Sequence, residues 1–298
     1  MTPPPSITAE QLKAVRALDL RARGLLNSLF AGDYRSVFRG QGMEFAEVRA
    51  YEPGDDVRHI DWNVSARSSQ LYVKTFTEER ELTVFVIIDR SASTAVGSTR
   101  VKSDLATEVG AVLGLAAAAQ QDRVGALLFT DRVEQVIPPQ KGRRHALRVV
   151  RDLVTFQPAG TGTDLAAALT YAGRLLQHRS VVVVLSDFAA ADWERPMRML
   201  AARHEVVAVL LRDPVDGSWP SAGWIEVADA ERGGRQLVDT RDAEVRARVG
   251  AADRLRRSVA LAALRRSGAD AVELATGDPW ILPLRRVFEA RARRRGHR

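Results

Sequence analysis

The sequence predicts an open α/β fold with a mostly parallel sheet and helices on both of its faces. Two observations lead to this class. From residue 82 onward, strand-sized apolar segments alternate with segments of helical periodicity. The apolar segments are also continuous, whereas a strand with one solvated face alternates apolar and polar residues. Strands of this kind are buried on both faces, and the helices that connect parallel strands supply the cover.

The individual elements follow from these patterns. Four strands are expected at LTVFVIID (82–89), VGALLFT (124–130), VVVVLSD (181–187) and EVVAVLL (205–211). Helical patterns lie near residues 100–120, 142–155, 164–178 and 191–203. In open α/β sheets ligands collect beyond the carboxyl ends of the strands, so the residues that follow each strand are the first candidates for a site.

The predicted α/β domain is preceded by two other segments. The expected divisions are an N-terminal helix (1–34), a small β-rich element (35–81), the α/β domain (82–240) and a C-terminal helical region (241–298). The first helix should begin near Thr8, which can form a capping box with Gln11, and dock onto its own domain. The β-rich element has two alternating segments, FAEVRAY and LYVKTF, around a charged middle.

The charged middle of the β-rich element predicts a structural network of ion pairs, with a binding surface as the alternative. The charges that could neutralise one another are Arg49, Asp55, Asp56, Arg58, Asp61 and Arg67. We expect Asp61 to be structural because it precedes Trp62, which we expect to be buried.

The C-terminal part has weaker patterns. We expect possible edge strands at 224–231 and 235–240, a long helix ended by Gly268, a short strand at 269–276 and a last helix at 278–295. Seven arginines and one glutamate in residues 285–298 supply most of the net charge of +7. Such a basic end is typical of a solvated helix, so no specific nucleic-acid partner is predicted. Nonspecific attachment of nucleic acid through this tail is an alternative.

Composition narrows the class of protein. The 298 residues are 46% hydrophobic and include no cysteine, which excludes disulfides, thiolate nucleophiles and cysteine-ligated metals. The apolar runs are strand-sized, and none approaches the roughly 20 residues of a membrane helix. The N-terminus also lacks the layout of a signal peptide. We therefore expect a cytoplasmic protein without a membrane span.

The stretch FVIIDRSAS (85–93) contains the first candidate site residues. A strand that suits a buried position runs into Asp89, and Ser91 and Ser93 follow at alternate positions. One carboxylate and two hydroxyls so close in sequence can converge on one point. Such oxygen atoms are hard ligands, which suit a cation such as Mg²⁺.

Two further polar residues are expected at the same edge of the sheet. Thr163 lies in the Gly-rich loop AGTGTDL (159–165), at or just before a predicted helix, and Asp187 ends a later strand. Taken alone, Thr163 would be an N-cap. Together with the residues after the first strand, these two complete a set of two carboxylates and three hydroxyls.

This set resembles the metal-ion-dependent adhesion site of von Willebrand factor A domains. The five matching positions are Asp89, Ser91, Ser93, Thr163 and Asp187. The resemblance implies a von Willebrand factor A-like domain that binds Mg²⁺ or Mn²⁺ at these residues. In that family the metal accepts a carboxylate from another protein, so a partner that offers an acidic side chain is expected.

The string EFAEVRAYEPGDDVRHIDWNVSARSSQLYVKTFTEERE (44–81) is similar to the hallmark of a bacterial family known as domain of unknown function fifty-eight. Genes of this family commonly neighbour those of MoxR-type AAA+ ATPases. The resemblance therefore implies a protein–protein interaction module that serves such an ATPase as adaptor or co-chaperone.

Enzymatic alternatives meet obstacles in the same residues. Haloacid-dehalogenase phosphatases also place an aspartate after a first strand, but they need a second acid two positions later, where this chain has Ser91. The sequence also lacks the G-x-S-x-G elbow, the GxxxxGK[ST] loop and the GxGxxG fingerprint. We therefore expect no enzymatic activity, with a phosphatase-type enzyme kept as an alternative.

Overall fold

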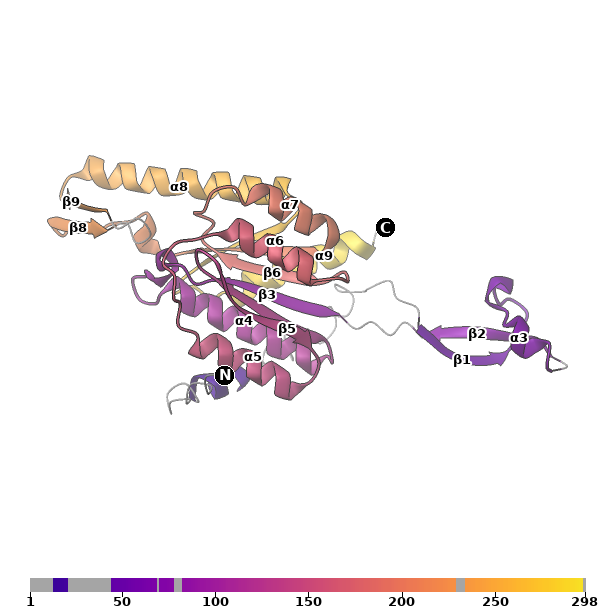
Figure 1. The fold of residues 1–298 in the computed structure, drawn as a ribbon. Helices are drawn as coiled ribbons and strands as arrows, with labels where there is room; N and C mark the ends of the chain where they lie inside the picture. The colour runs from indigo at the N-terminus through magenta and orange to yellow at the C-terminus, as the bar shows by residue number, and fades with distance from the viewer. Residues whose placement is uncertain (1–12, 21–43, 69, 78–81, 229–233, 297–298) are drawn as a thin grey trace. The chain divides into compact units, whose positions relative to one another are not determined.

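The computed structural model describes residues 13–20, 44–68, 70–77, 82–228 and 234–296. It contains two compact units, one formed by residues 39–81 and the other by the rest of the chain (Figure 1). Each unit is described by itself below.

Six strands form the main sheet of the larger unit, in the order β10-β7-β6-β3-β4-β5 (Figure 1). They are β3 (Thr83–Asp89), β4 (Arg123–Phe129), β5 (Val133–Gln140), β6 (Val181–Ser186), β7 (Glu205–Arg212) and β10 (Asp270–Ala275). All neighbouring strands pair in parallel except β4 and β5, which are antiparallel. The predicted α/β class with a mostly parallel sheet is confirmed.

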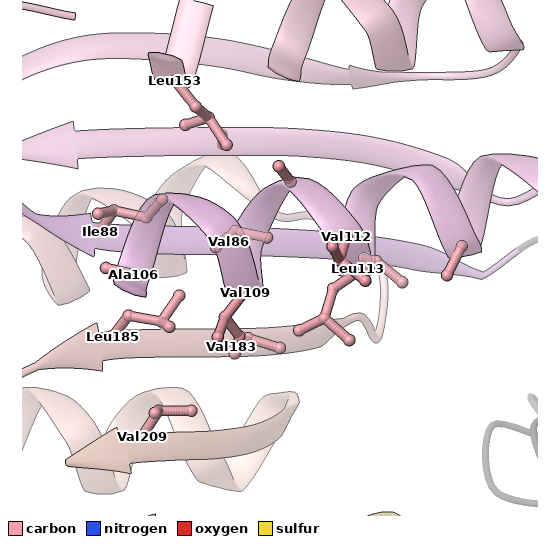
Figure 2. Close-up of a cluster of buried hydrophobic side chains, with 14 of the residues drawn as sticks. Val86, Ile88, Ala106, Val109, Val112, Leu113, Leu153, Val183, Leu185 and Val209 are labelled. Atoms are coloured by element: carbon pink, nitrogen blue, oxygen red, sulfur yellow. The ribbon is translucent and has the colours of Figure 1, made fainter. Parts of the chain in front are cut away.

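Alternate residues of each central strand enter different hydrophobic cores. In β3, Val86 and Ile88 belong to the core on one face, and Phe85 and Ile87 to the core on the other. Figure 2 shows the first core, where strand side chains lie beside those of α4 (Lys102–Ala119). Full burial of one such side chain stabilises the fold by about 1.5–3 kcal/mol, which explains why these strands are apolar at every position.

Helices cover both faces of the sheet. On the first face lie α4, α5 (Arg143–Thr155) and α9 (Ile281–Gly296), and on the second lie α6 (Leu165–Leu175), α7 (Glu194–Arg203) and α8 (Ala243–Arg266). The four helices expected between the strands are confirmed as α4 to α7. The long helix expected before Gly268 is confirmed as α8, and Gly268 has the positive φ of 82° that favours glycine after a helix.

Three expectations about the sheet need correction. Strand β5 was not predicted, because Pro138 and Pro139 argue against a strand in all but an edge position, which β5 occupies. The segments expected as edge strands of the sheet form a separate hairpin, β8 (Trp224–Ala228) with β9 (Arg235–Asp239). The boundary expected at residue 240 is wrong for the sheet, because β10 pairs with β7 and places the C-terminal region inside the α/β domain.

Both ends of the chain contribute to the larger unit. Residues 13–20 are helical and bury Leu18 in the first core, so the expected docking of the N-terminal helix is confirmed over this range. Its expected start near Thr8 lies outside the described residues. In the basic end, Arg291 is 13% exposed and lies 2.8 Å from Asp270. The basic end was expected to be a solvated helix end. Arg291 corrects this expectation, because it is mostly buried and its ion pair with Asp270 stabilises the fold.

The smaller unit is an antiparallel hairpin, as expected, of β1 (Glu44–Ala50) and β2 (Tyr72–Thr77). In the turn region between the strands, Arg49 donates two hydrogen bonds of 2.8 and 2.6 Å to the carboxylate of Asp55. A bidentate pair of this kind fixes the direction of the chain after β1.

The position of Trp62 contradicts the sequence-based expectation that it is buried, because its side chain is 67% exposed. Asp61 is the N-cap of the one-turn helix α3 (Trp62–Ser65) and accepts hydrogen bonds from two of its amides. The second carboxylate oxygen of Asp61 lies 3.5 Å from Lys74 Nζ of β2. Asp61 therefore faces the hairpin, whereas Trp62, the next residue, faces solvent.

These contacts predict that Asp61→Ala destabilises the hairpin, whereas Trp62→Ala does not. Loss of an N-cap costs about 1 kcal/mol, while removal of an exposed side chain usually changes stability by less than about 0.5 kcal/mol. Hydrogen exchange of the β1 and β2 amides in each variant measures the difference. Equal protection in the two variants would contradict the capping role of Asp61.

Candidate functional site

The turn after β3 brings three of the five expected site residues together. Asp89 is fully buried, and its Oδ1 accepts hydrogen bonds from Ser91 N at 2.9 Å and from Ser91 Oγ at 2.6 Å. Ser93 Oγ lies 3.1 Å from Ser91 Oγ. The alternation of the motif therefore does place both hydroxyls on the side of the carboxylate.

A fourth hydroxyl, which the sequence analysis missed, comes from the neighbouring strand. Ser186 is the last residue of β6, and its Oγ donates a 2.6 Å hydrogen bond to Asp89 Oδ2. Both carboxylate oxygens of Asp89 are thus bonded to neutral groups. Among the residues that the structure describes, none forms an ion pair with this buried carboxylate. Strands β3 and β6 pair in parallel, so their carboxyl ends lie side by side. A polar residue at the end of a second apolar strand is the sequence signal that could have identified Ser186.

This environment raises the pKa of Asp89 to about 7. Burial is the largest cause, because it disfavours the charged carboxylate, and the nearby charge of Asp187 acts in the same direction. The hydrogen bonds from Ser186 and Ser91 oppose both effects without cancelling them. The edge of the sheet therefore holds a buried carboxylate that forms no ion pair with any residue in the described part of the chain.

Asp187, the second expected carboxylate, follows β6 directly and is also buried. Its Oδ1 accepts from Ala189 N at 3.2 Å, and its Oδ2 lies 3.3 Å from the ammonium of Lys102. Lys102 also lies 3.3 Å from Asp216. Sequence analysis missed both of these residues, because nothing in a single sequence shows that the first turn of α4 lies next to the end of β6.

The loop that contains Thr163 is bonded to the turn after β3. Ala92 N donates to Thr161 O at 2.9 Å, so Thr163 lies at the same edge of the sheet as the serines. The N-cap of α6 is Asp164, whose side chain accepts from Ala167 N. The alternative role of Thr163 as an N-cap is therefore excluded.

Glu134 holds the other end of this loop. Its carboxylate accepts hydrogen bonds from Ala159 N at 2.8 Å and from Gly160 N at 2.7 Å. Residue 160 must be glycine, because a Cβ there would overlap Thr130 Oγ1 and Asp131 Oδ1. Hydrogen bonds from its backbone amides thus fix the start of this loop.

Comparison with known proteins identifies the family of this chain. Residues 47–259 match the family described as "Protein of unknown function DUF58". The chain belongs to this family. The family match begins in β1 and ends within α8, so it spans all five expected site residues of this DUF58 protein.

The names of two relatives of this DUF58 protein state no function. The "Uncharacterized protein Rv1480" of Mycobacterium tuberculosis is 33% identical over 284 residues, which cover 94% of this chain and 89% of that protein. The "Uncharacterized protein YeaD" of Bacillus subtilis is 34% identical over 108 residues, which cover 36% of this chain and 25% of that protein.

Solved structures give weaker likenesses to this DUF58 protein. BatB from Bacteroides thetaiotaomicron has a TM-score of 0.47 at 13% identity and covers 71% of this chain and 99% of its own. The SpRpn10 VWA domain has a TM-score of 0.36 at 11% identity, covering 68% of this chain and 92% of its own. Among the described helices, none is both long and apolar enough to cross a membrane.

The raised pKa of Asp89 predicts a pH-dependent stability. The carboxyl group has an ordinary pKa of 3.8 and a pKa of about 7 in the folded protein. Between these values the folded protein keeps a proton that the unfolded chain has released, so this contribution to stability is lost as pH rises through about 7. With chelator present, we expect the wild type to lose roughly 2 kcal/mol more than Asp89→Asn between about pH 5 and pH 8.

Denaturant unfolding of both proteins across this pH range measures the difference. Asp239→Asn is the matched control, because Asp239 is paired with Arg241 near the surface and the pKa of Asp239 is lowered. Parallel stability profiles of the wild type and Asp89→Asn would show that burial does not raise the pKa of Asp89.

Proposed function

We propose that this protein is a metal-dependent protein-binding module. In this proposal Mg²⁺ or Mn²⁺ binds at the carboxyl edge of the sheet and accepts an acidic side chain from a partner. The residues that would hold the metal are Asp89, Ser91, Ser93, Thr163 and Asp187. The observation that carries the proposal is the buried carboxylate of Asp89, which accepts hydrogen bonds from two hydroxyls and one amide and has no ion-pair partner within the described part of the chain.

The donor atoms suit a small divalent cation. Ser91 Oγ donates its hydrogen to Asp89, so Ser93 is the donor in the hydrogen bond between the two serines. One lone pair of Ser91 Oγ then remains for a cation. Mg²⁺ binds oxygen ligands and keeps several of its waters, so a site with few carboxylates and several hydroxyls is sufficient. Within the described residues, no group of three or more His, Cys, Asp or Glu side chains could hold a metal ion. A metal at this edge would therefore need the hydroxyls.

The same contacts favour binding over catalysis. The groups that bond to the Asp89 carboxylate are two hydroxyls and one backbone amide, none of which acts as a general base near neutral pH. The ammonium of Lys102 is engaged by two carboxylates. A metal with an open coordination position and no positioned base is suited to accept a carboxylate from another protein.

The proposed partner is a MoxR-type AAA+ ATPase, which this chain would serve as adaptor or co-chaperone. Residues 47–259 match the family named above. Support for this class of partner comes from what that resemblance implies, namely that genes of the family neighbour those of MoxR-type ATPases. A client protein that offers a glutamate or an aspartate to the metal is the alternative occupant of the same site.

The metal site predicts that Asp89→Ala abolishes binding of Mg²⁺ and Mn²⁺, because neutral hydroxyls alone cannot replace the carboxylate. Calorimetric titration of metal into the two proteins measures this loss, and circular dichroism checks that the fold survives. Asp278→Ala is the matched control, because its carboxylate is 69% exposed and is not one of the five proposed ligands. Unchanged binding in Asp89→Ala would remove this residue from the site.

Partner binding should need the metal. We expect a pull-down of the ATPase to require Mg²⁺ and to fail with EDTA or with Thr163→Ala, while Ser258→Ala, which changes a hydroxyl on exposed α8, retains it. Attachment of nucleic acid through the basic end would instead resist EDTA and weaken steeply between about 50 and 200 mM salt.

Truncation after Arg291 separates these two modes of binding, because it removes basic residues and leaves Leu284 and Phe288 in the core. Association that survives EDTA and is lost on truncation would overturn the proposed function in favour of the basic end.

A further inference from the structure

Lys102 is a buried cation beside the proposed metal site. Its side chain is 4% exposed, and its Nζ lies 3.3 Å from Asp187 Oδ2 and 3.3 Å from each carboxylate oxygen of Asp216. Lysine is rarely buried this fully unless its charge is paired. The ammonium therefore occupies a position between one proposed metal ligand and one carboxylate that is not a proposed ligand.

The second carboxylate is held in place independently of Lys102. Asp216 ends the short helix η3 (Pro214–Asp216), and its Oδ2 accepts from Asp213 N at 2.9 Å. Asp213 in turn accepts hydrogen bonds from Ser98 N at 3.0 Å and from Thr276 Oγ1. The backbone around η3 is thus fixed to the loop before α4 and to the end of β10, so Asp216 stays available to Lys102.

A role in stabilising α4 does not explain this lysine. Lys102 is the first residue of that helix, where the helix dipole disfavours a positive charge. The two carboxylates offset this cost, and they do so at the edge of the sheet where a second cation is proposed to bind.

We propose that Lys102 is a built-in competitor for Asp187 that sets the affinity of the metal site, an inference that rests on the proposed function. A metal at this edge and the ammonium of Lys102 repel each other and compete for the same carboxylate. Because Lys102 and Asp187 are buried, the repulsion would be stronger there than in water. When Asp187 binds the metal, Lys102 keeps its ion pair with Asp216.

Two substitutions at this cluster should change metal affinity in opposite directions. Lys102→Met removes the competing charge and keeps a side chain of similar length, so Mg²⁺ and Mn²⁺ should bind at least about tenfold more tightly, or about 1.4 kcal/mol. Asp216→Asn leaves Lys102 to Asp187 alone, so the metals should bind several-fold more weakly. Calorimetric titration of each metal alone measures both changes.

Thermal unfolding gives a second readout that does not depend on a partner. Without metal, Lys102→Met should melt below the wild type, because Asp187 and Asp216 lose their shared cation, and Mg²⁺ should raise its melting temperature more than that of the wild type. Arg100→Met is the matched control, because it removes a nearby cation that pairs with Glu108 and should change metal affinity little.

A double variant keeps the inference testable if Lys102→Met does not fold. Lys102→Met with Asp216→Asn removes one charge of each sign, and it should bind metal more tightly than Asp216→Asn alone. Equal metal affinity in the wild type and Lys102→Met, or in the double variant and Asp216→Asn, would overturn the role of Lys102 and leave the proposed function intact. Absence of metal binding in the wild type and in every variant would overturn both.

Discussion

The hydrogen bond from Ser186 to Asp89 joins the ends of the two strands around which the rest of the larger unit is arranged. Strand β3 lies between β4 and β6 and is buried on both faces. A ligand can therefore reach β3 only where the strand ends, at the carboxyl edge of the sheet. The turn after β3, the loop before α6 and the first turn of α4 all meet there. A backbone hydrogen bond joins the turn to the loop, and a buried ion pair joins the first turn of α4 to the end of β6.

The sequence contained enough information for the central sheet and its helices. Continuous apolar runs are sufficient to identify β3, β4, β6 and β7, because strands buried on both faces have no polar positions. Continuous apolar runs do not mark β5 and β10, which lie at the two edges of the sheet and have mixed patterns. A short strand was expected at 269–276, where β10 lies, but none was expected at β5. Periodicity also cannot show that β10 returns to pair with β7 after the long helix α8.

The site was predicted in part, for a related reason. Asp89, Ser91 and Ser93 are close in sequence, so local geometry alone brings them together. Ser186 and Lys102 reach the same edge through strand order and through the packing of α4, which are long-range features. Trp62 was expected to be buried because large aromatic side chains usually are, but the one-turn helix α3 buries none of its residues.

The prolines of β5 have a consequence for association between copies of this chain. An exposed edge strand presents unpaired amide and carbonyl groups, to which a strand of another molecule can add. Pro138 and Pro139 have no amide hydrogen, and the register of β4 and β5 shifts opposite them, between Val124 and Ala126. This end of the sheet is therefore a poor template for a foreign strand, which protects a very apolar sheet from edge-to-edge aggregation.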